Sequence, residues 1–272
     1  MDRHNQLGAS GDNAKIQDLT PQVRTAFILG AGLGLRLRPL TLHCPKPLLP
    51  VEGRPLITYV MEHLYAAGSR RFIVNTHHCP EAYAHAFPRG RWRDAAVVLR
   101  HEPVLLDTGG GLKNIEDLLE ESDTRLIVYN GDILTDLPLA ILLAAHVAAT
   151  PAAEVTLALR STGPVCNVAL AADGRVCDLR GRLGEPGERS CQFAGISVVE
   201  RRFLARLTPG RCESLVEAWL RLIAEGNCAV RGVVIDTGQW HDVGTIAAYE
   251  RLRKERFFRR DPPRPPLGGA AA

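Results

Sequence analysis

Three kinds of phosphate-binding residue stand close together near the start of the chain. A short apolar run ends in Gly30, Gly32 and Gly34, and Arg36 and Lys46 follow, the lysine between two prolines. Glycines at this spacing allow a sharp turn whose bare N–H groups can approach an anion, because no Cβ stands in the way. A guanidinium and an ammonium group add the positive charge that a polyphosphate requires. The stretch therefore predicts a polyphosphate site.

The glycine pattern alone is weak, because ordinary tight turns contain similar spacings. A dinucleotide-binding loop would need G-x-G-x-x-G at the start of a helix and an acidic residue about 20 positions later. Position 35 is leucine here, and prolines at 39, 45, 47 and 50 prevent a helix after the loop. The chain also has no G-x-x-x-x-G-K-[ST] sequence. A dinucleotide site is therefore not expected.

A second group of candidate residues follows a β-branched and aromatic run that predicts a strand. These residues are Asn130, Gly131 and Asp132. Ligands of open α/β sheets lie at the carboxyl ends of the strands, and an aspartate there offers Mg²⁺ the hard oxygen donor it prefers. The alternative is that Asp132 or Asp136 only caps the following helix, and Asp136 is expected to do so. From the residues alone, Asp132 remains a candidate for either role, metal ligand or helix cap.

Three more glycines, at positions 109, 110 and 111, precede an expected helix at residues 112–119. Bare amide groups at a helix N-terminus bind anions, so this segment is a second candidate for contact with a nucleotide. The alternative is an ordinary helix cap with a loose loop. The residues alone do not decide between these two interpretations.

Length, charge and cysteine content restrict the class of protein. The 272 residues suffice for one sizeable α/β core, and residues 25–258 contain no Gly/Ser-rich linker, so one domain is expected. With 33 basic and 30 acidic residues the net charge is +3, which is too balanced for a nucleic-acid-binding surface. Seven scattered cysteines without a C-x-x-C pair indicate reduced thiols rather than disulfides or zinc.

No secretory signal is visible in the first residues of the sequence. Residues 1–24 are polar and predict a flexible leader, and the Pro/Gly-rich residues 259–272 predict a disordered tail. The most apolar run, residues 137–149, is shorter than the roughly 20 residues that cross a bilayer. We therefore expect a soluble cytoplasmic protein without membrane or nucleic-acid partners.

Apolar patterns of strand and helix type occur along the whole chain. Strands are expected at residues 26–29, 71–75, 95–100, 125–129, 154–159, 167–170, 191–199 and 230–235. Helices are expected from residue 55 to 68 and at 81–87, 112–119, 201–207, 214–224 and 246–257, with another that begins near residue 138.

Residues 32–41, GLGLRLRPLT, together with PKP at 45–47, resemble the signature of the sugar-1-phosphate nucleotidyltransferases. Further matches to that family are LLDTGGG at 105–111, NGD at 130–132, FAGISV at 193–198 and WHDVGT at 240–245. The likeness extends from residue 26 to about 253. It implies a single three-layer α/β/α, Rossmann-like domain at residues 25–258, with a mixed, mostly parallel central sheet.

The resemblance implies a Mg²⁺-dependent enzyme that converts a nucleoside triphosphate and a sugar 1-phosphate into a nucleoside diphosphate sugar and pyrophosphate. Arg36 and Lys46 are its implied catalytic residues, Arg36 on the departing phosphates and Lys46 near the α-phosphorus. Asp132 and Asp242 are the implied Mg²⁺ ligands, although Asp242 could otherwise cap the last helix. In such a reaction positioning and charge neutralisation carry the catalysis.

The resemblance also implies the residues that bind the two substrates. Asn167 and Gly195 are implied for the sugar. The residues implied for the nucleotide are Gly30, Gly32, Gly34, Leu35, Glu102, Thr108, Gly109 and Asn130. Of these, Thr108 and Gly109 are expected beside the base and ribose, and Glu102 is expected to read the base.

Two departures from the family pattern concern these sites. Leu35 stands where the family has Thr or Glu before the signature arginine, which leaves the contact of that side chain open. The Glu-Lys-Pro lysine that holds the sugar phosphate in many relatives is absent, and Arg180 or Arg182 could replace it.

Substrate choice is the least determined property. The motifs are most similar to the small branch that includes N-acetylmuramate 1-phosphate uridylyltransferase, which implies UTP. One alternative is a GTP- or CTP-using enzyme of the same fold, such as a mannose-1-phosphate guanylyltransferase. Another is a non-catalytic paralogue that binds a nucleotide sugar as a sensor or regulatory subunit. The sequence predicts no oligomeric state.

Overall fold

The structure is a computed structural model, in which residues 23–149, 152–226 and 228–255 are described. Most of the expected leader and all of the expected tail lie outside these residues. Val23, however, is only 2% exposed and packs in the core, so the ordered fold already includes it. None of the helices in the described part of the chain has the length and apolar character needed to cross a membrane.

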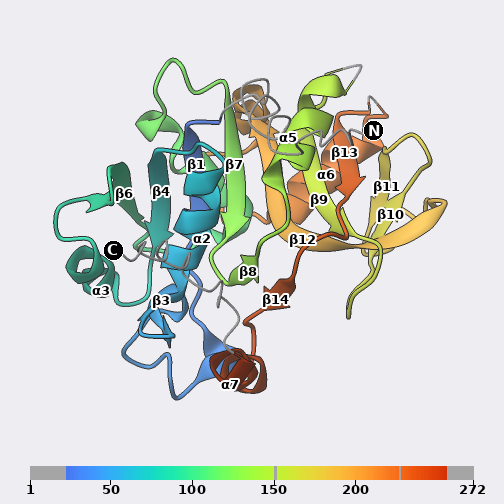
Figure 1. Ribbon diagram of the computed structural model, residues 1–272. Helices are drawn as coiled ribbons and strands as arrows, with labels where there is room; N and C mark the ends of the chain where they lie inside the picture. Colours follow the sequence, from blue (N-terminus) through green and yellow to red (C-terminus); the bar gives the residue numbers. More distant parts are fainter. Residues whose placement is uncertain (1–22, 150–151, 227, 256–272) are drawn as a thin grey trace, which may run out of the picture.

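A ten-stranded sheet forms the centre of the protein (Figure 1). Eight strands follow the order β11-β10-β12-β7-β1-β4-β6-β5; β9 also pairs with β12, and β13 pairs with β9. The strands are β1 (Thr25–Leu29), β4 (Arg71–Thr76), β5 (Arg91–Trp92), β6 (Ala95–His101), β7 (Arg125–Asn130), β9 (Val155–Arg160), β10 (Val168–Leu170), β11 (Val176–Leu179), β12 (Arg189–Glu200) and β13 (Val230–Val234). Only β5, β11 and β12 run against the others, so the predicted mixed, mostly parallel sheet is confirmed.

Helices cover both faces of this sheet. The helices in the described residues are α2 (Leu56–Ala66), α3 (Pro80–Ala86), α4 (Asp107–Lys113), α5 (Leu139–Ala148), α6 (Leu215–Ala224) and α7 (Ile246–Glu255), with short 3₁₀ turns η1 (Leu35–Leu37), η2 (Lys46–Leu48), η3 (Glu116–Leu118) and η4 (Arg201–Arg206). One core cluster includes residues of α2, α3 and α5, and the other includes residues of α4, α6 and η4. Two helical layers on one sheet confirm the predicted α/β/α class.

Strand β1 shows how alternation in the sequence produces the two cores. Ala26 and Ile28 pack in the α2 cluster, whereas Phe27 between them packs in the α6 cluster. All three side chains are fully buried. Successive residues of a strand point to opposite faces, so a strand buried on both sides must be apolar throughout.

A third, smaller apolar cluster lies at one end of the sheet (Figure 1). It joins the 35–51 segment, α2, α7 and the two-stranded ribbon of β8 (Ile133–Thr135) and β14 (Trp240–Asp242). The short hairpin of β2 (Pro50–Val51) and β3 (Arg54–Pro55) contributes Val51, which is fully buried. Tyr249 of α7 donates a hydrogen bond to the Pro50 carbonyl at 2.6 Å. This cluster therefore connects the signature loop to the last helix.

Two local predictions were wrong. The helix expected at residues 112–119 is α4 at Asp107–Lys113, so the three glycines lie inside a helix and not before it. Asp136 does not cap α5, whose N-cap residue is Pro138. The Asp136 carboxylate instead accepts a hydrogen bond from the Gln239 amide at 2.6 Å and so fixes the turn that precedes β14.

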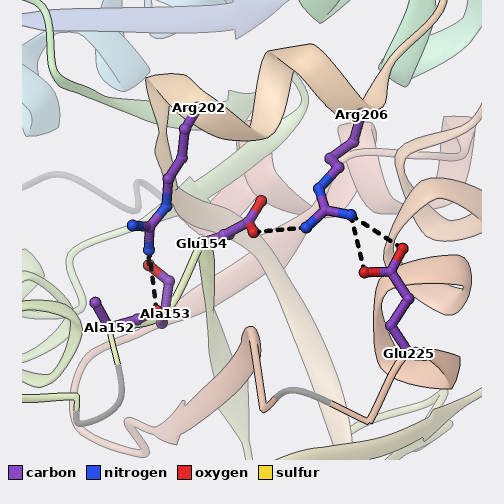
Figure 2. Close-up of polar contacts among 6 residues, drawn as sticks. All are labelled: Ala152, Ala153, Glu154, Arg202, Arg206 and Glu225. Carbon is purple, nitrogen blue, oxygen red and sulfur yellow. Dashed lines mark hydrogen bonds and ion pairs between the residues drawn. The ribbon is translucent and has the colours of Figure 1, made fainter.

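An arginine pair ties η4 to its neighbours (Figure 2). Arg206 binds Glu225 at the end of α6 through two hydrogen bonds, of 2.8 and 3.0 Å, and Glu154 beside β9 at 3.1 Å. Arg202 donates to the backbone carbonyls of residues 152 and 153. Exposed ion pairs each contribute at most about 1 kcal/mol, so this network orients η4 more than it stabilises the fold.

One partly buried histidine joins α2 to β7 and to the segment before α5. His63 Nε2 donates to the Leu137 carbonyl at 2.8 Å, and Nδ1 accepts from the Tyr129 hydroxyl at 3.0 Å. Burial lowers the pKa of His63, so the ring is neutral in the folded protein at neutral pH.

We expect His63→Ala to lower the free energy of unfolding by about 2–4 kcal/mol at pH 7.5, because two buried polar groups lose their partners. The difference from wild type should shrink as the pH falls through the ordinary histidine pKa of about 6.5, since the unfolded chain then gains a proton that folded His63 does not take up. Urea unfolding at pH 7.5 and 5.5 measures both effects. His85→Ala, at an exposed position on α3, is the control. A pH-independent difference would contradict the assignment.

Candidate active site

The candidate site lies at the carboxyl ends of β1 and β7, where the signature loop meets the β8–β14 ribbon. Asp132 lies two residues after the end of β7, and Asp242 ends β14, paired with Ile133 of β8. The Val243 amide donates to the Asp132 carbonyl at 3.0 Å. The ribbon thus places two aspartates that are 110 positions apart in the sequence next to each other. This is the edge at which open α/β sheets bind ligands.

Lys46 contacts the Asp132 carboxylate directly. It begins η2, and its side chain is only 11% exposed, so the ammonium group has little freedom. Pro45 and Pro47 flank it and restrict the backbone on both sides. The lysine between prolines is therefore held at the carboxylate, as its sequence context suggested.

Arg36 lies on the other side of the aspartate pair. A Cβ atom placed on Gly244 would lie 2.8 Å from Asp242 Oδ1 and 3.1 Å from Arg36 Nη2. Both charged groups thus border the same glycine. The structure brings together all four residues implied as catalytic or metal-binding, and they come from three separate parts of the chain.

The four side chains carry two positive and two negative charges, but the two carboxylates still repel each other. Partial burial and the neighbouring Asp132 raise the pKa of Asp242 above its usual range, although Lys46 and Arg36 oppose the rise. Two adjacent carboxylates are unfavourable unless a cation lies between or beside them. A hard divalent cation such as Mg²⁺ fits this pair, because its preferred ligands are oxygens.

Metal binding here would need oxygens from outside the protein. No group of three or more His, Cys, Asp or Glu residues suited to a metal occurs in the described part of the chain. Mg²⁺ is commonly held by one or two carboxylates, with the remaining positions filled by water and substrate phosphates. The donor set of Asp132 and Asp242 therefore fits a cation that binds together with a phosphate.

Gly30 differs from the sequence prediction, because its backbone is not available to a ligand. Its amide donates to Asn75 Oδ1 at 2.8 Å, and its carbonyl accepts from the Tyr83 hydroxyl at 2.8 Å. Gly32 is exposed, and nothing lies within 4 Å of a Cβ placed on it. The open part of the loop therefore begins after Gly30.

The next part of the loop turns tightly into η1. Gly34 has a φ of +62°, and its carbonyl accepts hydrogen bonds from Leu37 N and Thr41 Oγ1. Leu35 begins η1 and is 57% exposed. The turn directs residue 35 outwards, which explains why an apolar residue there does not disturb the fold.

The Thr108–Gly111 segment also differs from the prediction of bare amides. The Gly109 and Gly110 amides donate to the Glu213 carbonyl at 2.7 and 3.0 Å, and Thr108 Oγ1 accepts from Leu215 N at 2.8 Å. A Cβ on Gly110 would lie 2.2 Å from the Arg211 carbonyl oxygen. The glycines thus let α4 pack against the backbone that leads into α6.

Glu102 has no exposed surface. Its two carboxylate oxygens accept hydrogen bonds from Asn75 Nδ2 at 2.8 Å and from the Leu106 amide at 3.1 Å. All its partners lie within the protein, so this structure does not place it as a reader of the base. Sequence reasoning gave Asn75 no role in the site, although the segment Asn75–His78 after an apolar strand resembles one that the family often has there.

The implied sugar residues lie at different distances from the aspartate pair. Gly195, with a φ of +80°, sits at an irregularity in β12, and a Cβ there would be 3.2 Å from Asn130 Nδ2. Asn130 and Gly195 are therefore neighbours. Asn167 lies further out, before β10, and its carbonyl accepts from the Arg180 amide at 2.7 Å.

The two arginines near the missing lysine position are also placed. Arg182 lies 3.8 Å from Glu217 on α6. The backbone amides of Arg182, Leu183 and Gly184 all donate to the buried Asp178 carboxylate. Arg182 thus extends towards α6, on a loop that a single carboxylate organises.

Comparison with known proteins shows the family to which the chain belongs. Residues 25–165, just over half of the chain, match the family described as nucleotidyl transferase. The chain therefore belongs to the nucleotidyl transferase family, which confirms the resemblance seen in the sequence. Over 231 residues it is 35% identical to a protein of Mycobacterium tuberculosis named mannose-1-phosphate guanylyltransferase. A Gibberella zeae protein named mannose-1-phosphate guanyltransferase is 36% identical over 123 residues.

The chain is shorter than these relatives. The alignments cover 83% of this chain and 62% of the mycobacterial protein, and 44% of this chain and 33% of the fungal protein. The chain thus spans less than two thirds of the relatives' length.

Solved structures share the fold at lower sequence identity. HddC from Yersinia pseudotuberculosis, in complex with GMP-PN, superposes with a TM-score of 0.69 at 19% identity, over 86% of this chain and 99% of that one. A putative glucose-1-phosphate thymidylyltransferase from Bacillus anthracis superposes with a TM-score of 0.71 at 18% identity, over 85% and 94% of the two chains. These likenesses establish the common architecture.

The raised pKa of Asp242 predicts an effect on stability. In a chelator-treated protein, Asp242→Asn should increase the free energy of unfolding at neutral pH. Folding then no longer places a negative charge in a partly buried position beside Asp132. The gain should shrink as the pH approaches the ordinary aspartate pKa of about 3.9, where the carboxyl group becomes protonated in both states.

Urea unfolding between pH 7.5 and pH 4.5 measures this dependence. Asp236→Asn is the matched control, because hydrogen bonds from Ser161 lower the pKa of Asp236, so its loss should reduce stability. If Asp242→Asn were as destabilising as the control at neutral pH, the unfavourable charge at Asp242 would be refuted.

Proposed function

We propose that this protein transfers a nucleotidyl group from a nucleoside triphosphate to a sugar 1-phosphate and releases pyrophosphate. The observation that carries the proposal is the convergence of Arg36, Lys46, Asp132 and Asp242 at the carboxyl edge of the sheet, in a member of the nucleotidyl transferase family. Two cations and two carboxylates at one point suit a reaction between two phosphate anions, in which charge repulsion is the main barrier.

The chemistry requires one bond to form and one to break at the α-phosphorus. An oxygen of the sugar phosphate attacks in line, and the bond to the β-phosphate oxygen breaks, so that pyrophosphate leaves. Lys46, held at Asp132, neutralises charge near the α-phosphate, and Arg36 binds the leaving phosphates. Asp132 and Asp242 would hold a divalent cation, Mg²⁺ in our proposal, which supplies charge neutralisation when bound.

The substrates are proposed from the relatives. The names of the mycobacterial and fungal proteins favour GTP and mannose 1-phosphate as the first pair to test. UTP, which the motif resemblance implied, is the second choice. All these substrates are cytoplasmic metabolites, and we propose that the protein acts there.

A non-catalytic nucleotide-sugar sensor is the competing function. Leu35 and the missing Glu-Lys-Pro lysine favour it, whereas the intact four-residue cluster opposes it. The two functions differ in a simple way, since a sensor would bind a nucleotide or nucleotide sugar without turnover.

Pyrophosphate release decides between them. Each of the four nucleoside triphosphates is combined with mannose, glucose and N-acetylmuramate 1-phosphates, with Mg²⁺ and with chelator. Metal-dependent release with one pair would establish the reaction and name both substrates. A folded protein that binds nucleotide but releases no pyrophosphate with any pair would refute the enzyme and favour the sensor.

Lys46→Ala should reduce kcat by about 10²–10³-fold, the usual effect of removing one well-placed electrostatic group. Steady-state kinetics with the active pair measures it. Lys254→Ala, at an exposed position on α7, is the matched control and should leave kcat unchanged. Turnover of Lys46→Ala close to that of the control would remove Lys46 from the mechanism.

A further inference from the structure

A buried polar pair lies beneath the candidate site and has no part in the chemistry proposed above. Asn75 is 2% exposed near the end of β4, and Glu102 is fully buried just after β6. The two strands are parallel neighbours, so their ends lie side by side. A buried carboxylate is costly unless hydrogen bonds satisfy it, and a purely structural position would be filled more easily by an apolar residue.

The pair forms a continuous chain of hydrogen bonds. The Gly30 amide donates to Asn75 Oδ1 at 2.8 Å, and Asn75 Nδ2 donates to Glu102 Oε1 at 2.8 Å. From the other side the Leu106 amide donates to Glu102 Oε2 at 3.1 Å. A carboxylate only accepts, so each link has one possible direction.

This series of hydrogen bonds begins and ends at backbone amides of two segments next to the candidate site. Gly30 is where β1 ends and the glycine loop begins, and Leu106 is the N-cap residue of α4. The Leu106 carbonyl in turn accepts from the Glu213 amide at 3.0 Å, which continues the contact to the segment before α6. The series of hydrogen bonds thus fixes the distance between the loop after β1 and the segment before α4, which no backbone–backbone hydrogen bonds join directly.

Gly111 supports the same arrangement. A Cβ on this residue would lie 2.8 Å from Asn75 Nδ2 and 2.9 Å from Glu102 Oε1. Any larger residue would therefore push α4 away from the pair. The third glycine of the Gly-Gly-Gly sequence is explained by this close approach.

We propose that Asn75 and Glu102 are positioning residues that hold the glycine loop and the Leu106–Gly110 segment at the separation that the nucleoside triphosphate requires. The proposal rests on the proposed function, because it assumes that both segments flank the nucleotide. Glu102 acts through the backbone amides of Gly30 and Leu106, at the two ends of this series of hydrogen bonds, and does not touch the base.

A reciprocal exchange of the two side chains tests this. In Asn75→Asp alone, two carboxylates face each other. In Glu102→Gln alone, the single amide oxygen can accept from Asn75 or from Leu106 but not from both, so one hydrogen bond is lost. In the double variant N75D/E102Q, the new carboxylate at 75 accepts from Gly30 and from the new amide at 102. The oxygen of that amide then accepts from Leu106, so every link is restored.

Triphosphate binding, steady-state kinetics and amide hydrogen exchange are measured for all three variants. Each single variant should raise the Kd and KM for the triphosphate about tenfold, the scale of losing a buried hydrogen bond to a charged group, with a smaller change in kcat. Amide hydrogen exchange at Gly30 and Leu106 should accelerate. The double variant should return the Kd and the exchange to within about threefold of wild type.

Asp178→Asn is the matched control, because Asp178 is also a buried carboxylate that accepts from loop amides, but of residues 182–184. It should lower stability and leave the Kd for the triphosphate unchanged. If Glu102→Gln behaved like this control, the pair would be only structural. If Glu102→Gln altered the preference among triphosphates and the double variant did not reverse it, Glu102 would contact the base. Either result overturns the proposal.

Folding and function are kept separate in this design. If a single variant does not fold, the double variant decides alone: a wild-type Kd supports the proposal, and a folded double variant with a tenfold higher Kd overturns it. If wild type binds the triphosphate without turnover, only the proposed enzyme fails, and the Kd series still tests the pair. A wild-type protein that binds no triphosphate overturns both.

Discussion

The candidate site depends on the pairing of β8 with β14. This short ribbon fixes Asp132 and Asp242 by backbone hydrogen bonds, so the two carboxylates remain adjacent despite their mutual repulsion. Lys46 and Arg36 then offset the negative charge from two sides. The fold thus holds two like charges together, and a ligand that adds positive charge there would reduce their repulsion.

Much of the fold follows from local patterns in the sequence. The apolar runs at β1, β4 and β7 are buried on both faces, and such runs are typical of parallel strands under helices. The positions of Lys46 and Asp132 in the candidate site were also predictable from their neighbours. Lys46 stands between two prolines, and Asp132 follows a strand that ends at the site. In both cases the nearest neighbours in sequence restrict the geometry.

The parts that sequence reasoning missed depend on contacts between distant residues. Asn75 and Glu102 are 27 positions apart, and neither residue type indicates the other as its partner. The glycines at 109–111 suggested open amides, but the Glu213 carbonyl, more than a hundred positions away, occupies two of them. Asp136 looked like a helix cap, yet its partner is Gln239. The type of a polar residue shows which hydrogen bonds it can form, whereas the packing of the folded chain decides which partner it has.

The contact between α7 and the signature loop has a consequence for how the site comes into being. Tyr249 and Leu252 complete the apolar cluster that also holds Leu37 and Leu49, and β14 adds the second aspartate just before this helix. The second aspartate and the apolar cluster behind the signature loop are thus supplied by residues 240–252, which are synthesised after every strand of the central sheet.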